Sequence, residues 1–410
     1  MYFIYNILIL IVAFSLKIVA FLNKKINLFV EGRSLTFSKL TAAISKEDMV
    51  IWMHCASLGE FEQGRPIIEK LKVQYPTYKL VITFFSPSGY EIRKNYEVAD
   101  VVCYLPLDSK KNAKQFLTVV HPSFAIFVKY EFWPNLLKEL QNKQIKTILV
   151  SGIFRKDQVF FKWYGGWMRK SLTAFSHFFV QDKNSKELLE SIHFQNITLS
   201  GDTRFDRVFE ITKQNNTLDF IAEFKSNSYT LVAGSTWKED EDLLVEYINN
   251  KASENEKFII APHNIKAKEI EELKNSIAKK TVLFSEKENK NLKDFQVFII
   301  DTVGILTKIY NYANIAYVGG GYTKSGIHNV LEPATFGVPI VIGPNYQKFN
   351  EAIELVRNKA CFVVDNSQKL SVLLDEFYQD KQKRDLAGSN ALNYVINNTG
   401  ATSKILNFIK

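Results

Sequence analysis

The chain has 410 residues, which exceeds the length at which a single hydrophobic core keeps growing, so two domains are the default expectation. Its 46% hydrophobic and 23% charged residues are typical of a folded globular protein, and its net charge of +9 suits nucleic acid, an anionic lipid or a phosphorylated substrate. The absence of zinc-ligand spacing and of a recognisable nucleic-acid-binding pattern makes nucleic acid the least favoured of these partners, and three scattered cysteines indicate a reducing compartment without disulfides.

The N-terminal segment, residues 1–25, is predicted to be a membrane anchor. Residues Met1–Leu22 are apolar almost throughout and are about long enough to cross a bilayer. Because Lys24 and Lys25 follow the apolar run and no basic residue precedes it, the positive-inside rule predicts that the rest of the chain is cytoplasmic. Lys17 interrupts the run and leaves open a spanning helix or a helix that lies in the interface with Lys17 snorkelling. A buried core helix is the third alternative, although a core helix rarely lacks a polar face.

Two series of short strands alternate with helices, which is typical of parallel sheets covered by helices. The predicted strands of the first series are Met49–Met53, Lys79–Phe85, Phe124–Val128, Thr147–Val150 and Phe178–Val180, with helices over Gly64–Gln74 and Pro134–Lys143. Those of the second series are a strand from Tyr229, Lys257–Ala261, Val297–Ile300, Ile315–Val318, Pro339–Ile342 and Cys361–Val364.

The two series predict an α/β protein with two Rossmann-like domains that face each other across a cleft. The predicted first domain covers residues 26–205, a connection without clear strand period covers 206–228, and the second domain covers 229–410. Ligands of such sheets bind at the carboxyl ends of the strands, so polar clusters that directly follow strands are candidate sites.

In the first domain, three such clusters contain charged residues. Glu60 opens the helix after the first strand, and it is either a general base or a carboxylate that only compensates the helix dipole. Glu131 follows the strand that ends at Val128 and is a second candidate site residue. The alternative is that it is an ordinary solvated charge in the first turn of a helix that begins with aromatic residues. Arg204 lies near the connection, and its ordinary role would be to pair with Asp202 or Asp206.

In the second domain, the most informative segment is Tyr317–Pro344, which reads as strand, glycine-rich turn, helix and short strand. Gly319–Gly321 would let backbone N–H groups approach a phosphate at a helix N-terminus. Glu332, about one helical turn beyond Asn329, could accept both hydroxyls of a ribose. The pattern predicts a nucleotide site, and the alternative is a βαβ turn whose glycines only permit tight packing.

Two more clusters of this domain follow strands in the same way. Pro262 and His263 follow the strand that ends at Ala261, although a lone His is more often structural than functional. Asp301–Ile305 follows the strand that ends at Ile300, so its N–H groups would point into the cleft.

Taken together, these segments resemble the glycosyltransferases that move 3-deoxy-D-manno-octulosonic acid (Kdo) from CMP-Kdo to the lipid A precursor. The resemblance covers essentially the whole chain. Its motifs occur in the order HCASLGE at 54–60, YEFWPNL at 130–136, GDTRFD at 201–206, DTVG at 301–304 and HNVLEPA at 328–334.

The resemblance implies an inverting enzyme of GT-B architecture, with an acceptor-binding N-terminal domain and a CMP-binding C-terminal domain. It implies that Glu60 is the proton acceptor and that Glu131 and Arg204 stabilise the transition state. The CMP-contacting residues that it implies are Pro262, His263, Val303, Gly304, Ile305, Asn329, Val330, Leu331 and Glu332.

The chain departs from the family pattern at two places in the second domain. An Arg often precedes the His of the Pro-Arg-His turn, whereas Pro262 directly precedes His263 here. Ile327 stands where a second Gly usually precedes His-Asn. Neither change touches the residues to which the resemblance assigns the chemistry.

The implied partners are the donor CMP-Kdo, the acceptor lipid IVA and the lipids of the inner membrane, on its cytoplasmic face, in lipopolysaccharide biosynthesis. No nucleic acid partner is expected. CMP carries a single phosphate rather than two that a metal would bridge, so we expect no divalent metal and no cofactor. Two other functions stay open, namely a membrane-associated GT-B transferase that uses a UDP-sugar and a non-catalytic membrane-anchored nucleotide sensor.

Overall fold

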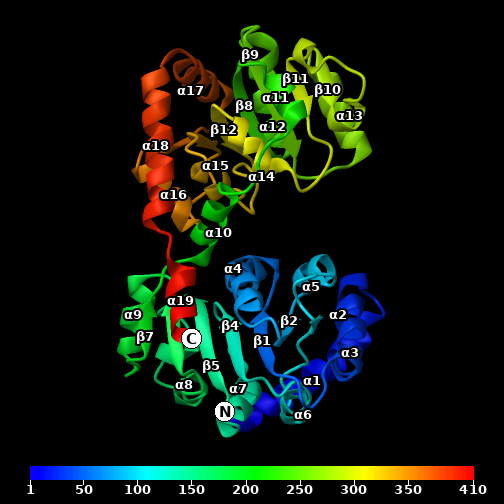
Figure 1. The fold of residues 1–410 in the computed structure, drawn as a ribbon, viewed down its shortest axis with the longest axis vertical. Coiled ribbons are helices and arrows are strands. Elements are labelled where there is room, and N and C mark those ends of the chain that lie inside the picture. Colours follow the sequence, from blue (N-terminus) through cyan, green and yellow to red (C-terminus); the bar gives the residue numbers. More distant parts are fainter. The chain divides into compact units, whose positions relative to one another are not determined.

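The computed structural model describes residues 1–410 and divides them into two compact units, each of which is described by itself. Unit 1 comprises Met1–Arg207 together with Thr399–Lys410, and unit 2 comprises Val208–Asn398. Each unit contains one seven-stranded parallel sheet with helices on both faces (Figure 1). The predicted α/β class with two Rossmann-like domains is confirmed.

The sheet of unit 1 has the strand order β3-β2-β1-β4-β5-β6-β7. Its strands are β1 Val50–Cys55, β2 Lys79–Phe84, β3 Val101–Tyr104, β4 Phe124–Val128, β5 Lys146–Gly152, β6 His177–Val180 and β7 Ile197–Leu199. Its helices are α1 Tyr2–Ala20, α2 Lys24–Ser34, α3 Thr36–Ala43, α4 Leu58–Gln74, α5 Pro87–Arg93, α6 Lys110–Val120, α7 Pro134–Asn142, α8 Gly166–Leu172, α9 Lys183–Glu190, α10 Thr203–Ile211 and α19 Ala401–Ile409, with a 3-10 turn at Val159–Phe161.

Strand β1 shows why the sequences of the central strands are continuous runs of apolar residues. Trp52 packs into the core on one face of the sheet, whereas Ile51 and Met53 pack into the core on the other face. Side chains alternate between the faces of a strand, and both faces are covered here. The strand order reverses between β1 and β4, and such a switch point is where parallel sheets bind ligands.

The sheet of unit 2 has the order β10-β11-β9-β8-β12-β13-β14, with the switch point between β8 and β12. Its strands are β8 Tyr229–Thr236, β9 Glu256–Pro262, β10 Thr281–Leu283, β11 Val297–Ile299, β12 Ile315–Val318, β13 Ile340–Ile342 and β14 Cys361–Val363. Its helices are α11 Asp219–Lys225, α12 Lys238–Asn250, α13 Ala267–Ser276, α14 Leu306–Ile309, α15 Leu331–Thr335, α16 Asn350–Arg357, α17 Ser367–Gln379 and α18 Lys381–Asn397, with 3-10 turns at Phe284–Glu286, Leu292–Asp294 and Tyr310–Tyr312.

The last twelve residues differ from the expectation that residues 229–410 form one domain. Helix α19 belongs to unit 1, because Ile405 and Ile409 are buried in the core that α4 covers. Asp206 lies in unit 1, just before the chain first passes into unit 2. It accepts hydrogen bonds from the backbone N–H groups of Gly400 at 2.5 Å and Thr402 at 2.7 Å. The predicted connection over 206–228 contains no strand and holds the end of α10 and all of α11.

The N-terminal helix α1 has the length and composition of a membrane-crossing helix. Its apolar window has a mean hydropathy of 2.3, and none of it is buried inside the protein. A helix that exposes large apolar side chains along its whole length is not a core helix, so that alternative is excluded.

Candidate active site

Glu60 lies in the first turn of α4, directly after the carboxyl end of β1. Its side chain is buried, at 6% exposure, and the hydroxyl of Ser57 donates a hydrogen bond to its Oε2. Ser57 is the N-cap residue of α4, yet its side chain makes no hydrogen bond to the helix backbone. The hydroxyl that would ordinarily cap the helix is therefore used to hold the carboxylate.

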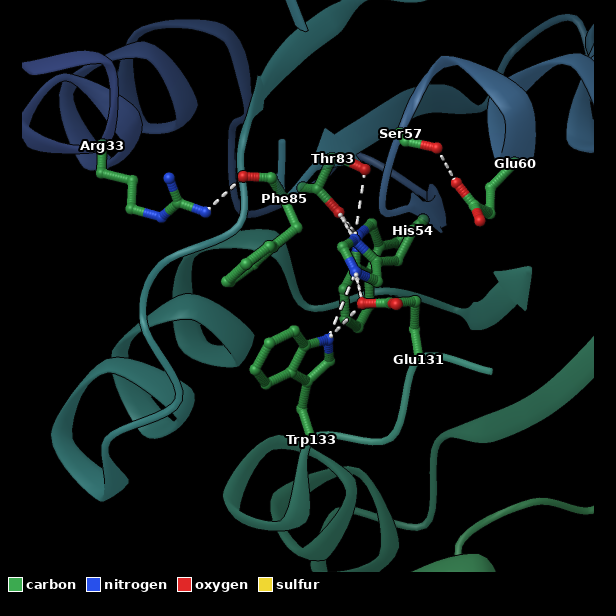
Figure 2. Close-up of polar contacts among 9 residues, drawn as sticks. Arg33, His54, Ser57, Glu60, Thr83, Phe85, Glu131 and Trp133 are labelled. Atoms are coloured by element: carbon green, nitrogen blue, oxygen red, sulfur yellow. Dashed lines mark hydrogen bonds and ion pairs between the residues drawn. The ribbon is translucent and has the colours of Figure 1, made fainter. Parts of the chain in front are cut away.

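Glu131 follows β4, on the other side of the switch point, and its Oε2 is the centre of a second cluster (Figure 2). The indole N–H of Trp133 donates to this oxygen at 3.1 Å, and Nε2 of His54 lies 3.4 Å from it. His54 is fully buried, and its Nδ1 lies 2.9 Å from the hydroxyl of Thr83 on β2. Side chains from three adjacent strand ends thus fix the position of the Glu131 carboxylate.

The two carboxylates both raise the pKa of the same buried thiol. Burial raises the pKa of Cys55, at the end of β1, well above its ordinary value, and the negative charges of Glu60 and then Glu131 raise it further. The pKa of the Tyr130 phenol is also raised, first by burial and then by Glu60. Glu60 and Glu131 therefore place two negative charges at one edge of the sheet, where the sequence predicted a site.

Arg204 is bound to Asp202, as its ordinary interpretation proposed. The Nε atom of Arg204 donates to Asp202 Oδ2 at 2.8 Å, and Gln63 donates to the other oxygen at 3.1 Å. Gln63 lies one helical turn beyond Glu60 on α4, so Arg204 is joined to the helix that carries Glu60. Asp206, the other candidate partner, accepts hydrogen bonds from backbone N–H groups at the start of α19.

In unit 2, His263 is not a lone histidine but the middle of a stack of rings. Its ring lies 4.7 Å from that of Trp237, which follows β8, and 4.4 Å from that of His328. The indole N–H of Trp237 donates to His328 Nε2 at 3.1 Å. Burial, together with His263, lowers the pKa of His328 to about 4, so His328 is neutral near pH 7. His328 is therefore the neutral hydrogen-bond acceptor of this cluster.

The predicted nucleotide carboxylate, Glu332, is held at both oxygens. The side-chain amide of Asn329 donates to Oε1 at 3.0 Å, and the hydroxyl of Thr307 donates to Oε2 at 2.9 Å. Thr307 lies on α14, directly after the segment that contains Val303, and Val303 is 81% exposed. The structure therefore joins Glu332 of the predicted segment 329–332 to the helix that directly follows the predicted segment 303–305.

The glycine-rich turn does not have the predicted role at a helix start. The N–H of Gly319 donates to the carbonyl of Gly234, and the N–H of Gly320 donates to Asp240 Oδ2 at 2.8 Å. Helix α15 begins only at Leu331, so the prediction of a helix N-terminus directly after the glycines is wrong. A Cβ at Gly319 would strike the backbone of Ser235, which supports the alternative that this glycine permits tight packing.

Several side chains of these clusters were not singled out from the sequence. They are His54, Ser57, Thr83, Trp133, Trp237, Thr307 and His328. The quoted motifs contain His54, Ser57, Trp133 and His328, and Trp237 could have been found as the first residue after the strand at a switch point. Thr83 and Thr307 carry no local signal, because their partners are distant in the sequence.

The two sheets, each with a polar cluster at its switch point, define a protein of the GT-B class. A UDP-GlcNAc 2-epimerase from Neisseria meningitidis bound to UDP-GlcNAc has a similar fold, with a TM-score of 0.59 at 15% identity, over 88% of this chain and 99% of that chain. At this identity the likeness concerns the fold alone.

Residues 32–207 match the family described as 3-deoxy-D-manno-octulosonic-acid transferase (kdotransferase). The 3-deoxy-D-manno-octulosonic acid transferase of Aquifex aeolicus is 27% identical over 344 residues, which are 81% of this chain and 87% of the relative. A bifunctional glycosyltransferase/methyltransferase of Fusobacterium nucleatum is 26% identical over 88% of this chain, and the match spans only 57% of that longer relative. The first half of the chain thus contains a region that matches the Kdo transferase model, and the chain is similar to Kdo transferases over most of its length.

Proposed function

We propose that the protein is an inverting glycosyltransferase that transfers Kdo from CMP-Kdo to lipid IVA, at the cytoplasmic face of the inner membrane, in lipopolysaccharide biosynthesis. The observation that carries the proposal is the pair of carboxylates, Glu60 and Glu131, at the switch point of unit 1. Each is held in place by a dedicated donor, Ser57 for Glu60 and Trp133 for Glu131. The similarity to Kdo transferases supplies the sugar. The motif resemblance implies CMP as its nucleotide carrier.

In this mechanism, Glu60 is the general base. The acceptor hydroxyl attacks the anomeric carbon of Kdo, its proton passes to the Glu60 carboxylate, and CMP leaves from the opposite face. Proton transfer of this kind typically contributes about 10² to 10⁴-fold to the rate. The hydrogen bond from Ser57 uses one oxygen of Glu60 and leaves lone pairs for the incoming proton.

Arg204 and Glu131 have roles that follow from the charge of the donor. CMP leaves as a phosphate monoester dianion, and Kdo carries a carboxylate beside its anomeric carbon, so the reaction needs fixed positive charge. Arg204 supplies one such charge, and the aspartate and glutamine behind it hold its orientation. Glu131 is placed to stabilise the positive charge that develops on the sugar ring in the transition state.

Unit 2 is the CMP-binding unit in this proposal. The carboxylate oxygens of Glu332 each accept one hydrogen bond within the protein and retain lone pairs that can accept the two ribose hydroxyls. His263, Val303 to Ile305 and Asn329 to Leu331 are proposed to contact the remainder of the nucleotide. We expect no divalent metal, because a single leaving phosphate can be neutralised by side chains.

Mass analysis of the product formed from CMP-Kdo and lipid IVA tests the proposal. A mass increase that corresponds to added Kdo is the expected result. Thermal stabilisation by CMP but not by UDP should accompany it, since nucleotide binding raises the melting temperature. Stabilisation by UDP alone would indicate a UDP-sugar transferase, and CMP binding without product would indicate a nucleotide sensor.

A further inference from the structure

Helix α1 has two different faces along its entire length. The half-buried positions are Tyr2, Tyr5, Asn6, Ile9, Ala13, Leu16 and Ala20. They recur at the spacing of one helix face. The opposite face exposes large apolar side chains in one seven-residue stripe, namely Ile4 at 52%, Ile11 at 55% and Ile18 at 53% exposure. One side of α1 is therefore directed to the protein and the other side has no protein partner.

The start of α1 is bound to unit 1 by specific contacts. The hydroxyl of Tyr5 donates to Asp108 Oδ2 at 2.7 Å, and the hydroxyl of Tyr2 donates to Asn135 at 2.5 Å. The ring of Tyr5 also lies 5.8 Å from that of Trp167 on α8. Asp108 in turn accepts the backbone N–H groups of Asn135 and Leu136, at the first turn of α7. The N-terminal end of α1 is thus part of the polar network that begins α7.

The other end of α1 also returns to unit 1. A three-residue turn leads into α2, whose Arg33 donates to the carbonyl of Phe85 at 2.6 Å. The ring of Phe29 lies 5.4 Å from that of Phe85, and Gly32 has no room for a Cβ against the ring of Tyr104. A helix that crosses a bilayer must place its ends about 30 Å apart on opposite sides of the hydrocarbon core. Helix α1 instead begins on the globular unit, and the helix that follows it packs on the same unit.

A cationic pocket lies where α1 meets α7 and α8. Tyr2, Lys138, Trp167 and Lys170 are among the residues that line it. The indole Nε1 of Trp167 is buried without a hydrogen-bond acceptor in the protein. Burial and Asp108 raise the pKa of the Tyr2 phenol, and Glu139 on α7 raises it further. The negative charge of Glu139 also offsets part of the positive charge of the lysines. The pocket offers ammonium donors to a phosphate at the edge of the apolar face.

An aromatic pair lies on the segment that leads into the same helix, α8. The side chain of Trp163 is 91% exposed, and Tyr164 beside it is half-exposed. Exposed Trp and Tyr side chains of this kind are favoured at the level of lipid headgroups.

We propose that α1 lies flat in the cytoplasmic interface of an anionic bilayer and does not cross it. The face of α1 that contains Ile4, Ile11 and Ile18 enters the acyl region, while Lys138 and Lys170 bind headgroup phosphates. This proposal specifies how α1 is arranged at the membrane. It rests on the proposed function only in that the protein is attached to a lipid bilayer. It decides between the two arrangements that the sequence left open.

The depth of α1 in the bilayer tests the proposal. Single cysteines are introduced as Ile4→Cys, Ile11→Cys and Ile18→Cys, and the full-length protein is spin-labelled in vesicles that contain phosphatidylglycerol. The three native cysteines are buried and should not react. The expected result is one common depth, about 5 to 10 Å into the headgroup and acyl boundary, at all three positions. The matched control Ala13→Cys, on the half-buried face, should show lower exposure to lipid.

A depth that increases from Ile4 to a maximum near Ile11 and falls again at Ile18 would show a spanning helix and overturn the proposal. Labels that stay in water would overturn it as well. Because no substrate is used, a failed transfer assay with detergent-dispersed acceptor would refute the proposed function without changing the depth result.

The cationic pocket is tested by vesicle sedimentation. The double substitution Lys138→Ala and Lys170→Ala should weaken binding to phosphatidylglycerol vesicles by about five-fold for each lysine. Binding to phosphatidylcholine vesicles should change little. The control pair Lys183→Ala and Lys186→Ala, on α9, should leave both affinities unchanged. Equal losses for the two pairs would contradict a headgroup site at this pocket.

Discussion

The hydroxyl of Thr307 donates a hydrogen bond to Glu332 at 2.9 Å, and so joins the segment after β11 to the segment after β12. The two residues are 25 positions apart in the sequence, and Thr307 lies just beyond the DTVG motif whereas Glu332 lies within HNVLEPA. Their contact makes one surface of two segments that were predicted separately to bind CMP. The position of the Glu332 carboxylate therefore depends on a residue outside its own motif.

The first prediction concerns this pair. Glu332→Ala should weaken CMP binding by about 1.5 to 3 kcal/mol, because it removes charge-assisted hydrogen bonds to the ribose. Thr307→Val, which keeps the shape of the side chain, should cost only about 0.5 to 1.5 kcal/mol. Calorimetric titration with CMP measures both values. An unchanged dissociation constant for Glu332→Ala would remove Glu332 from the nucleotide site.

The second prediction concerns Trp133, which donates to Glu131. Trp133→Phe retains the aromatic contact with Phe85 but lacks the indole N–H. Losing a hydrogen bond to a charged group is worth about 1.5 to 3 kcal/mol, so kcat should fall by about 10 to 100-fold. The KM for CMP-Kdo should change much less, because Trp133 is proposed to act through Glu131. A change in KM alone, with kcat intact, would show that the indole binds substrate instead.

The third prediction concerns pH. The folded-state pKa of His328 is about 4, below its ordinary value of 6.5, so the folded state resists protonation. The stability that this group contributes is complete above about pH 6.5 and is lost as the pH falls toward 4. His328→Gln keeps an acceptor for Trp237 and does not titrate. The wild-type protein should lose about 1 to 2 kcal/mol more than this variant between pH 7 and pH 4, after allowance for partial solvent exposure.

Denaturant unfolding of both proteins at several pH values measures that difference. Identical pH dependence in the two proteins would show that His328 titrates normally and that the stack with His263 does not exclude water.

The fourth prediction concerns Asp206, which holds the start of α19. Asp206→Ala leaves the backbone N–H groups of Gly400 and Thr402 without their acceptor. The loss of such a cap should lower the free energy of unfolding by about 1 to 2 kcal/mol. Hydrogen exchange of the amides in α19 localises the effect. Asp380→Ala, which removes the N-cap of α18, is the matched control and should leave α19 protected.

Much of the fold could be predicted from the sequence because the central strands are buried on both faces. The apolar runs at β1, β4 and β8 are continuous for this reason, and no other interpretation competes with them. Strands β7 and β10 are only three residues long and exist through pairing with β6 and β11, so no local pattern identifies them. The position of α19 depends on the buried side chains of α4, which the sequence of α19 does not specify.

The candidate site, like the fold, could be predicted from the sequence only in part. Glu60 and Glu131 could be found because each closely follows a strand within a recognisable motif, and Glu332 could be found from its motif alone. The contacts of His54 with Thr83 and of Trp237 with His328 join residues that are distant along the chain. The role of Gly319 and Gly320 was misjudged, since their N–H groups bond within the protein and a long loop separates them from α15.

The last prediction concerns Glu60 as the general base. Glu60→Gln preserves the size of the side chain and an acceptor for the Ser57 hydroxyl, but the amide cannot take the proton of the acceptor sugar. Glu69→Gln is the control, because it removes a carboxylate from the same helix that only pairs with Arg65 and Tyr96.

The most direct measurement is the rate of Kdo transfer per folded molecule for Glu60→Gln, with CMP affinity and melting temperature determined on the same preparation. Catalysis by Glu60 predicts that kcat falls by ~10² or more while CMP affinity and melting temperature stay near the wild-type values. If Glu60 only compensated the helix dipole, the substitution would cost about 0.3 to 1 kcal/mol of stability and leave the rate unchanged. Near-wild-type turnover by Glu60→Gln would contradict its assignment as the base.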